Sequence, residues 1–156
     1  MTQFSWFGYE VEVDEAATAV WYAQAGEWGC ECGSCRNFLA LARERRLPEE
    51  ILDILDRLHI PPEKATYVCQ LYTDQERGPL YQLSWRLAGS IAAKPEGKDA
   101  GPDWGPNVDF SWGGLRLGHE VYPYGAPGFP EPCFDLEGDM FLPWVLDEPM
   151  GGQKEE

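Results

Sequence analysis

The sequence predicts an α+β fold, in which an antiparallel sheet carries a two-helix hairpin inserted after the first strands. Apolar and polar residues alternate with a period of two near the start of the chain and over much of its second half, as in half-buried strands. Between these stretches, residues 35–58 show the spacing of amphipathic helices. The length of 156 residues, 44% of them hydrophobic, suits one domain. We expect this domain to span residues 1–150 and residues 151–156 to form a disordered tail.

The first strand is expected within residues 4–13. Its last residues alternate between an apolar face and an acidic face, which is typical of a strand with one side buried. The apolar face holds Tyr9, Val11 and Val13, and the acidic face holds Glu10 and Glu12. A second, short strand is expected over residues 19–23.

Two helices are expected next, and together they form the hairpin. In the first helix, Ser34 can serve as the N-cap. Apolar residues then recur at i, i+3, i+4 and i+7, namely Cys35, Phe38, Leu39 and Ala42. The second helix begins at Pro48, which suits the first helical position, and ends before Pro61. Its apolar stripe consists of Ile51, Ile54, Leu55 and Leu58.

The second half of the chain indicates β-structure. Strands are expected over residues 65–73, 80–88, 108–117 and 134–146. The first two are joined by a polar turn at residues 74–79. Gly, Pro and charged residues are frequent over residues 93–106, which we expect to form a long exposed loop. The apolar part of the last strand includes Trp144 and Val145.

The chain is strongly acidic, because 27 Asp and Glu residues against 12 Lys and Arg give a net charge of −15. The sequence has no basic patch that could replace the counterions of a phosphate backbone, so we expect no binding to nucleic acid or to an anionic membrane. The expected partner is a protein or a small molecule. The first residues do not have the pattern of a signal peptide, and no apolar run approaches the roughly 20 residues of a membrane span. We therefore expect a cytoplasmic protein.

The most informative motif is a cysteine cluster. Three of the five cysteines, Cys30, Cys32 and Cys35, lie within six residues. Disulfides are rare in the cytosol, so such a cluster indicates metal binding or thiol redox chemistry. Cys32-x2-Cys35 has the spacing of zinc knuckles, and Cys30 adds a third thiolate. The sequence therefore predicts a structural zinc site.

A fourth zinc ligand has to come from elsewhere in the chain, because structural zinc sites are almost always four-coordinate. Cys133 lies at the end of a predicted loop and is free to reach a metal. Cys69 shares a strand face with Tyr67 and is expected to face the core, where cysteine is more often a small hydrophobic residue than a ligand. The remaining candidates are His59, His119 and the carboxylates.

Two other interpretations of the cluster remain open. Cys32 and Cys35 have the spacing of thioredoxin-type dithiols, and the start of a helix should lower the pKa of Cys35. Thioredoxin-type sites, however, place the first cysteine at the helix start and lie in a βαβ unit, which this sequence does not predict. The third interpretation is that the thiols are reduced and inert.

The many aromatic residues allow a ligand-binding, carbohydrate-like interpretation as well. The chain has seven Trp, seven Tyr and seven Phe. Trp85, Trp104, Trp112 and Trp144 are spread over separate predicted elements, which favours packing over a shared binding surface. The sequence contains no phosphate-binding glycine loop, Gly-x-Ser-x-Gly or His-Glu-x2-His motif. An enzymatic role is therefore not favoured.

Two stretches of the chain resemble a known group of proteins. Cys-x-Cys-x2-Cys-Arg-Asn-Phe, followed by the two-helix segment, and the stretch Leu142–Pro149 (Leu-Pro-Trp-Val-Leu-Asp-Glu-Pro) are similar to uncharacterised small proteins of Firmicutes bacteria. The resemblance covers most of the chain and implies a small bacterial cytosolic protein, without implying a catalytic residue or a fourth ligand. We interpret the protein as a binding or accessory module with a zinc–thiolate site.

Overall fold

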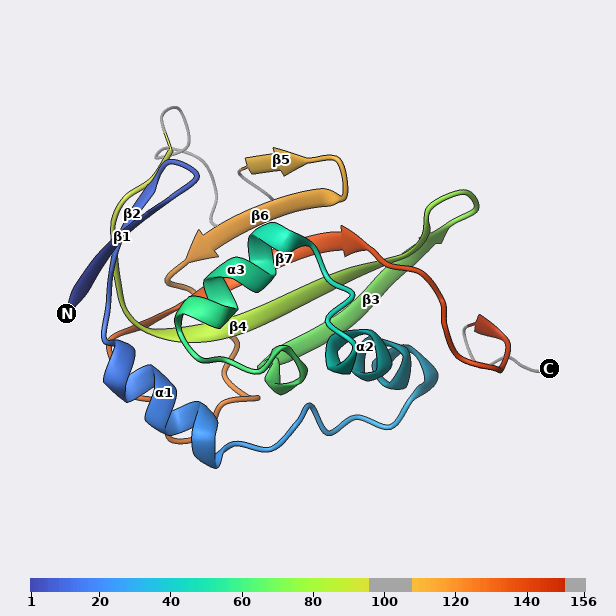
Figure 1. Cartoon of the computed structure of the whole chain (residues 1–156), viewed down its shortest axis with the longest axis horizontal. Helices are drawn as coiled ribbons and strands as arrows, with labels where there is room; N and C mark the ends of the chain where they lie inside the picture. Colours follow the sequence, from blue (N-terminus) through green and yellow to red (C-terminus); the bar gives the residue numbers. More distant parts are fainter. Residues whose placement is uncertain (96–107, 151–156) are drawn as a thin grey trace.

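A seven-stranded antiparallel sheet forms the centre of the molecule within residues 1–95 and 108–150, which the computed structural model describes. Helices cover one face of this sheet (Figure 1). The strands are β1 (Thr2–Trp6), β2 (Tyr9–Val13), β3 (Tyr67–Asp74), β4 (Gly78–Ala93), β5 (Val108–Phe110), β6 (Gly113–Gly118) and β7 (Cys133–Phe141). The α-helices are α1 (Glu15–Gln24), α2 (Gly33–Arg43) and α3 (Glu49–Arg57), and a short 3-10 helix spans Pro62–Lys64.

Strand β4 connects the two halves of the sheet. The strand order is β1-β2-β4-β7-β6-β5, and β3 also pairs with β4. Every pairing is antiparallel. Helices α2 and α3 follow the first two strands and pack over the same face of the sheet (Figure 1). The α+β prediction, with a helical hairpin after the first strands, is confirmed.

The first predicted strand is a hairpin of two strands. Strands β1 and β2 pair along their whole length, so that only Phe7 and Gly8 remain for the turn. Both residues have positive φ angles, of 54° and 96°, as tight two-residue hairpins require. The predicted apolar face of β2 is confirmed, because Tyr9, Val11 and Val13 are buried.

The expected short strand over residues 19–23 is wrong, because this stretch belongs to helix α1. Asp14 caps the helix, and its carboxylate accepts a hydrogen bond from the backbone N–H of Ala17 at 3.0 Å. Four alanines within the helix add high helix propensity. Thr18 and Tyr22, four residues apart, form its buried face and hydrogen-bond to the backbone of β4.

Helix α2 begins two residues earlier than predicted. Gly33 is its first residue, and Cys32 rather than Ser34 takes the N-cap position. The Ser34 hydroxyl instead donates to Oε1 of Gln70 in β3 at 2.8 Å, so it does not cap the helix. Cys35 still lies in the first turn, as predicted.

Two predicted strands of the second half have different bounds in the structure. Residues 108–117 form the β5–β6 hairpin instead of one strand. The strand predicted over residues 134–146 ends at Phe141, because the chain then turns toward α2. Most of the predicted loop at 93–106 and the whole predicted tail at 151–156 lie outside the described residues.

The side of the sheet that faces the helices carries the hydrophobic core. Alternate residues of β4 point to this side and are fully buried: Tyr81, Leu83, Trp85 and Leu87. They meet the predicted apolar stripes of the helical hairpin, of which Phe38, Ala42, Ile51, Ile54, Leu55 and Leu58 are buried. Burial of these side chains is the main favourable term for the fold.

The opposite side of the sheet carries two buried ion pairs. Arg116 and Glu137 face each other across β6 and β7, with 2.5 Å between Nη2 and Oε1, and are only 6% and 3% exposed. Arg86 and Asp135 pair in the same way across β4 and β7. The Tyr122 hydroxyl adds a hydrogen bond to Glu137 at 3.3 Å. Because these charges have left water, each depends on its partner.

Replacing Glu137 with alanine should therefore lower the free energy of unfolding by about 3–5 kcal/mol, because Arg116 would remain buried without its partner. Urea unfolding followed by tryptophan fluorescence measures this change. Asp56→Ala is a matched control, since it also removes the acid of an ion pair. The side chains of Asp56 and its partner Arg45 are 53% and 48% exposed. Exposed pairs contribute little, so this variant should unfold close to the wild-type midpoint. Equal losses of unfolding free energy in the two variants would contradict the conclusion that Arg116 depends on Glu137 because the pair is buried.

Candidate metal centre

Three cysteine side chains come together where α2 begins. The Sγ atoms of Cys30, Cys32 and Cys35 all lie within 4.8 Å of one another. Cys32 is the N-cap of α2, Cys35 is its third residue, and Cys30 lies in the preceding loop. In a tetrahedral site with Zn–S bonds of about 2.3 Å, the sulfurs stand roughly 3.8 Å apart. The spacing in the structure is close to what one shared metal ion requires, so this cluster can bind a metal.

Cys35 is the buried member of the cluster and is only 5% exposed. Burial raises the pKa of its thiol to about 12, although Trp28 Nε1–H donates a hydrogen bond to the Cys35 Sγ at 3.1 Å. The expectation of a lowered pKa for Cys35 is wrong, because burial of the thiol raises its pKa. A negatively charged sulfur is the stronger acceptor for the Trp28 N–H, and metal binding would supply one.

Cys30 and Cys32 are exposed and lie at the solvent side of the cluster. The backbone N–H of Cys32 donates a hydrogen bond to the sulfur of Cys30, which lowers the pKa of the Cys30 thiol below its usual value. The cluster thus has two sulfurs that solvent reaches and one, on Cys35, that the protein encloses. A metal held here would lie at the surface.

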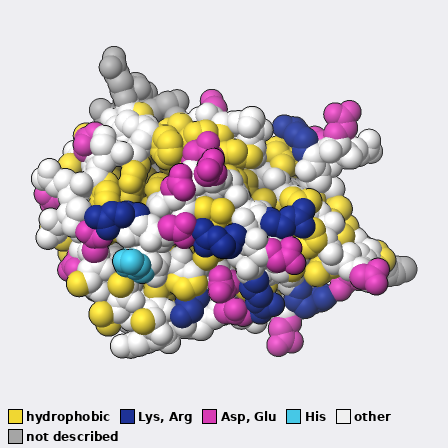
Figure 2. Space-filling view, in the orientation of Figure 1, with side chains coloured by type: hydrophobic (Ala, Val, Ile, Leu, Met, Phe, Trp, Pro, Cys, Tyr) yellow, Lys and Arg dark blue, Asp and Glu magenta, His cyan; other side chains and the backbone are white. Residues whose placement is uncertain are grey.

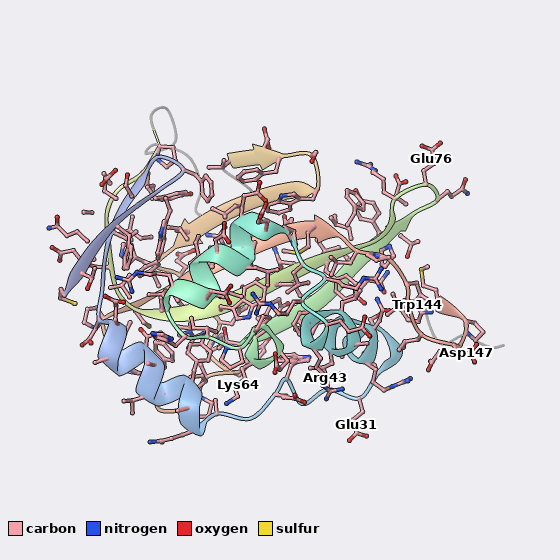
Figure 3. The ribbon with its side chains drawn as sticks, viewed as in Figure 1. Glu31, Arg43, Lys64, Glu76, Trp144 and Asp147 are labelled. Atoms are coloured by element: carbon pink, nitrogen blue, oxygen red, sulfur yellow. The ribbon has the colours of Figure 1, made fainter. Side chains whose placement is uncertain are left out.

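Two acidic side chains near the cluster, Glu148 and Glu27, are paired with arginines. Arg36 binds the Glu148 carboxylate through two hydrogen bonds of 2.6 and 3.0 Å, and its Nε donates to the backbone oxygen of Glu31 at 2.9 Å. Arg43 binds Glu27 at 2.5 Å. These hydrogen bonds lower the pKa of the Glu148 and Glu27 carboxyls. The Glu31 side chain points outward (Figure 3). Among the described residues, no carboxylate joins the three sulfurs.

The cysteine motif and the Leu142–Pro149 stretch contact each other in the structure. Asn37, which follows the cysteines and is fully buried, donates from Nδ2 to the Pro143 oxygen at 3.0 Å. Its Oδ1 accepts from the Val145 N–H at 2.7 Å. Trp144 lies beside α2 in this arrangement (Figure 3). The cysteine motif and the Leu142–Pro149 stretch therefore contact each other in the fold, a relation that their sequence separation does not reveal.

Cys133 and Cys69, the two named candidates for a fourth ligand, lie outside the cluster. Cys133 pairs with Ala88 of β4. The Tyr81 hydroxyl donates to the backbone of α2, near the cluster. Ala88 lies seven residues farther along β4, or roughly 23 Å of strand, and this length separates Cys133 from the cluster. Cys69 is half-buried, and its neighbour Val68 is the buried residue of β3. The expectation that Cys69 faces the core is wrong, because the opposite set of β3 side chains points to the helices.

The two histidines also lie outside the cluster. His59 directly follows the end of α3 and adopts a positive φ of 61°. The Nε2 atom of His119 accepts a hydrogen bond from the Ile91 N–H at 3.1 Å. Neither histidine is brought to the cysteines.

Most of the tryptophans named for a ligand-binding interpretation serve the packing of the protein. Trp85 is fully buried, and its indole N–H donates to the Pro62 oxygen at 3.0 Å. Trp112 and Trp144 donate in the same way to Glu50 and to the backbone of Glu148. Trp104 lies outside the described residues. The tryptophan that contacts the cluster is Trp28, which sequence reasoning did not single out, and its one signal was its position two residues before the cysteines.

Comparison of the chain with models of known protein families, with curated protein sequences and with solved structures finds no match. The resemblance to the Firmicutes group therefore stays a prediction. No helix in the described part of the chain is long and apolar enough to cross a membrane.

Replacing Asn37 with alanine should release the Leu142–Pro149 stretch from α2 and lower the free energy of unfolding by about 1–3 kcal/mol, because two hydrogen bonds, each worth about 0.5–1.5 kcal/mol, are lost. Limited proteolysis with mass spectrometry should show new cleavage after Phe141. Glu148→Gln is the control, since it removes only an ion pair at the surface of the same stretch. If Glu148→Gln opened the stretch as readily as Asn37→Ala, the buried amide would not be what holds it.

Proposed function

We propose that the protein is a binding or accessory module, and not an enzyme, in which Cys30, Cys32 and Cys35 bind one zinc ion. The observation that carries this proposal is the convergence of the three Sγ atoms to within 4.8 Å at the start of α2. Thiolates are soft ligands, and zinc is the common metal of tetrahedral thiolate sites. The metal would be structural, because it would join the loop before α2 to the first turn of the helix.

Local charge supports a divalent cation at this position. Three thiolates within 4.8 Å repel one another, and Glu31 adds a further negative charge nearby. Arg36 and Arg43, the arginines of α2, are already paired with acids and give the sulfurs little relief. A metal ion compensates the thiolate charge directly, while the Trp28 N–H stabilises the sulfur that solvent does not reach.

The fourth coordination position is proposed to face solvent and to hold water or a residue from outside the cluster. Of the two cysteines suggested by the sequence, neither lies in the cluster, and Cys69 shares only an indirect connection with it through Tyr67 and Trp28. Mutation of each cysteine therefore has to test it as a ligand.

A thiol-redox function is the second candidate, since Cys32 and Cys35 are close enough for exchange chemistry. One observation favours it, because Cys32, the first cysteine of the pair, is exposed and forms the N-cap of α2, where an attacking thiol of this type lies. Cys35, which is buried and whose thiol pKa is raised to about 12, could only be the resolving cysteine. The fold weighs against a redox function, because the cysteines precede a helix of an antiparallel α+β fold and not of a βαβ unit.

We also propose that the protein is cytoplasmic and that its partner is a protein or a small molecule. The net charge of −15 opposes binding to nucleic acid and to anionic membranes. All five cysteines are free thiols in the structure, which suits a reducing compartment. The carbohydrate-like alternative receives less support, because three of its four named tryptophans are engaged in internal hydrogen bonds.

Protein purified without oxygen should contain about one zinc per chain, measured by elemental analysis, and chelator should lower its melting temperature. Cys32→Ser should lose the metal, because Cys32 lies at the centre of the cluster in sequence and forms the N-cap. Cys69→Ser and Cys133→Ser, tested in parallel, identify a fourth cysteine ligand if either weakens binding. Metal-free protein with five titratable thiols and an unchanged melting temperature in chelator would overturn the proposal.

Alkylation with iodoacetamide separates the metal from the redox function. With zinc bound, Cys30 and Cys32 should label slowly despite their exposure, and chelator should speed their labelling by about tenfold or more. Cys133, which is half-buried and remote from the cluster, is the internal control, and its rate should not respond to chelator. A redox couple would instead label quickly without chelator and form a disulfide that mild reductant reverses.

A further inference from the structure

A groove of about 350 Å³ lies between the β1–β2 hairpin and α3, away from the cysteine cluster. Figure 2 shows acidic side chains standing among hydrophobic ones on this face of the molecule. Sites for small molecules commonly have volumes of about 300–1,000 Å³, apolar walls and a few polar groups. The groove has the size and the mixed chemistry of such a site.

The hairpin side of the groove is aromatic. Trp6 and Phe7 line it together with Ile54 of α3. Phe7 is 41% exposed and has a φ of 54°, a left-handed conformation that is strained for a bulky residue. Its ring packs edge-on against Phe110, with the centroids 5.2 Å apart. The chain thus places a large ring at a turn position where Asn or Gly would be less strained, and part of that ring remains available to a ligand.

The α3 side of the groove is acidic and carries Glu49, Glu50 and Asp53. The first two lie in the first turn of α3, where acids also favour the helix dipole. Asp53 lies beyond that turn and gains little from the dipole. One oxygen of Glu50 accepts from the indole N–H of Trp112 at 3.0 Å, which fixes the carboxylate at the groove.

Arg57 also lines the groove, but its charge is already matched. It forms an ion pair with Glu15, and its guanidinium lies 5.0 Å from the centre of the Phe4 ring. The three acids are therefore not neutralised by Arg57. The contact between Arg57 and Phe4 also shows that a cation next to an aromatic ring is stable at this end of the hairpin.

We propose that the groove binds a small organic cation, an amine or guanidine attached to an apolar body. The apolar body would contact Trp6 and Phe7, and the cationic group would face Asp53 and Glu49. The net charge of −15 attracts such a ligand from a distance. A neutral sugar could contact the aromatic rings, but it would gain no charge interaction with three carboxylates. This proposal is independent of the metal site.

Phenethylamine is a suitable probe, with 2-phenylethanol as its neutral analogue, in NMR titrations of the isotope-labelled full chain as purified. The amine should shift resonances of the β1–β2 turn and of α3, and should bind about fivefold or more tightly than the alcohol. Asp53→Asn and Glu49→Gln should each weaken amine binding by about threefold, because each removes one facing charge. Glu76→Gln is the matched control, since Glu76 lies on the β3–β4 turn far from α3 (Figure 3).

Three results would overturn the proposal. Equal affinity for the amine and the alcohol would show that the carboxylates do not select a cation. An equal loss of amine affinity in Glu76→Gln would show that the overall charge of the protein, and not the groove, attracts the amine. Shifts that map to another part of the surface would place the binding elsewhere. Since all three substitutions are at surface acids, the variants should fold, and their circular dichroism verifies this.

Discussion

The arrangement of the helical layer on the sheet depends mainly on hydrogen bonds to one strand, β4. Helix α1 is attached through Thr18 and Tyr22, which bind backbone groups of β4. The Tyr81 hydroxyl donates to the backbone of α2, and the Trp85 indole donates to the 3-10 helix. The same strand pairs with β2, β3 and β7. Because β4 pairs with three strands and also bonds to α1, α2 and the 3-10 helix, its register sets the positions of these elements relative to one another.

The cysteine cluster is held between two parts of the chain that β4 brings together. On one side, the first turn of α2 is fixed to the sheet through Ser34, which bonds to β3 and β4. On the other side, Asn37 fixes the following turn to the Leu142–Pro149 stretch. Cys32 and Cys35 thus lie on a supported helix end, whereas Cys30 lies on a loop. Such a frame keeps two sulfurs in place and leaves the third able to adjust to a ligand.

The sequence predicted the helical hairpin and the cysteine cluster, because both are local features. The stripe from Ile51 to Leu58 needs only the helical period, and the cluster needs only proximity along the chain. The face on which Cys69 lies could not be predicted, because a period of two defines two faces but does not say which one the helices cover. The burial of Cys35 was predictable from its place in the apolar stripe of the helix, but its hydrogen bond from Trp28 was not, since that contact depends on the path of the loop before the cysteines. Helix α1 was predictable from Asp14 and the alanines, and was missed because apolar residues 19–23 were interpreted as a strand.

The tie between α2 and the C-terminal stretch affects the order of events during synthesis. Arg36 and its partner Glu148 are separated by 112 residues. A ribosome that adds about 5–20 residues per second needs roughly 6–22 s to make that interval. Throughout this time the three cysteines have left the peptidyl-transferase centre, while the stretch that braces α2 does not yet exist. A metal ion supplied to the nascent chain would therefore meet a looser cysteine loop than the one that the finished protein presents.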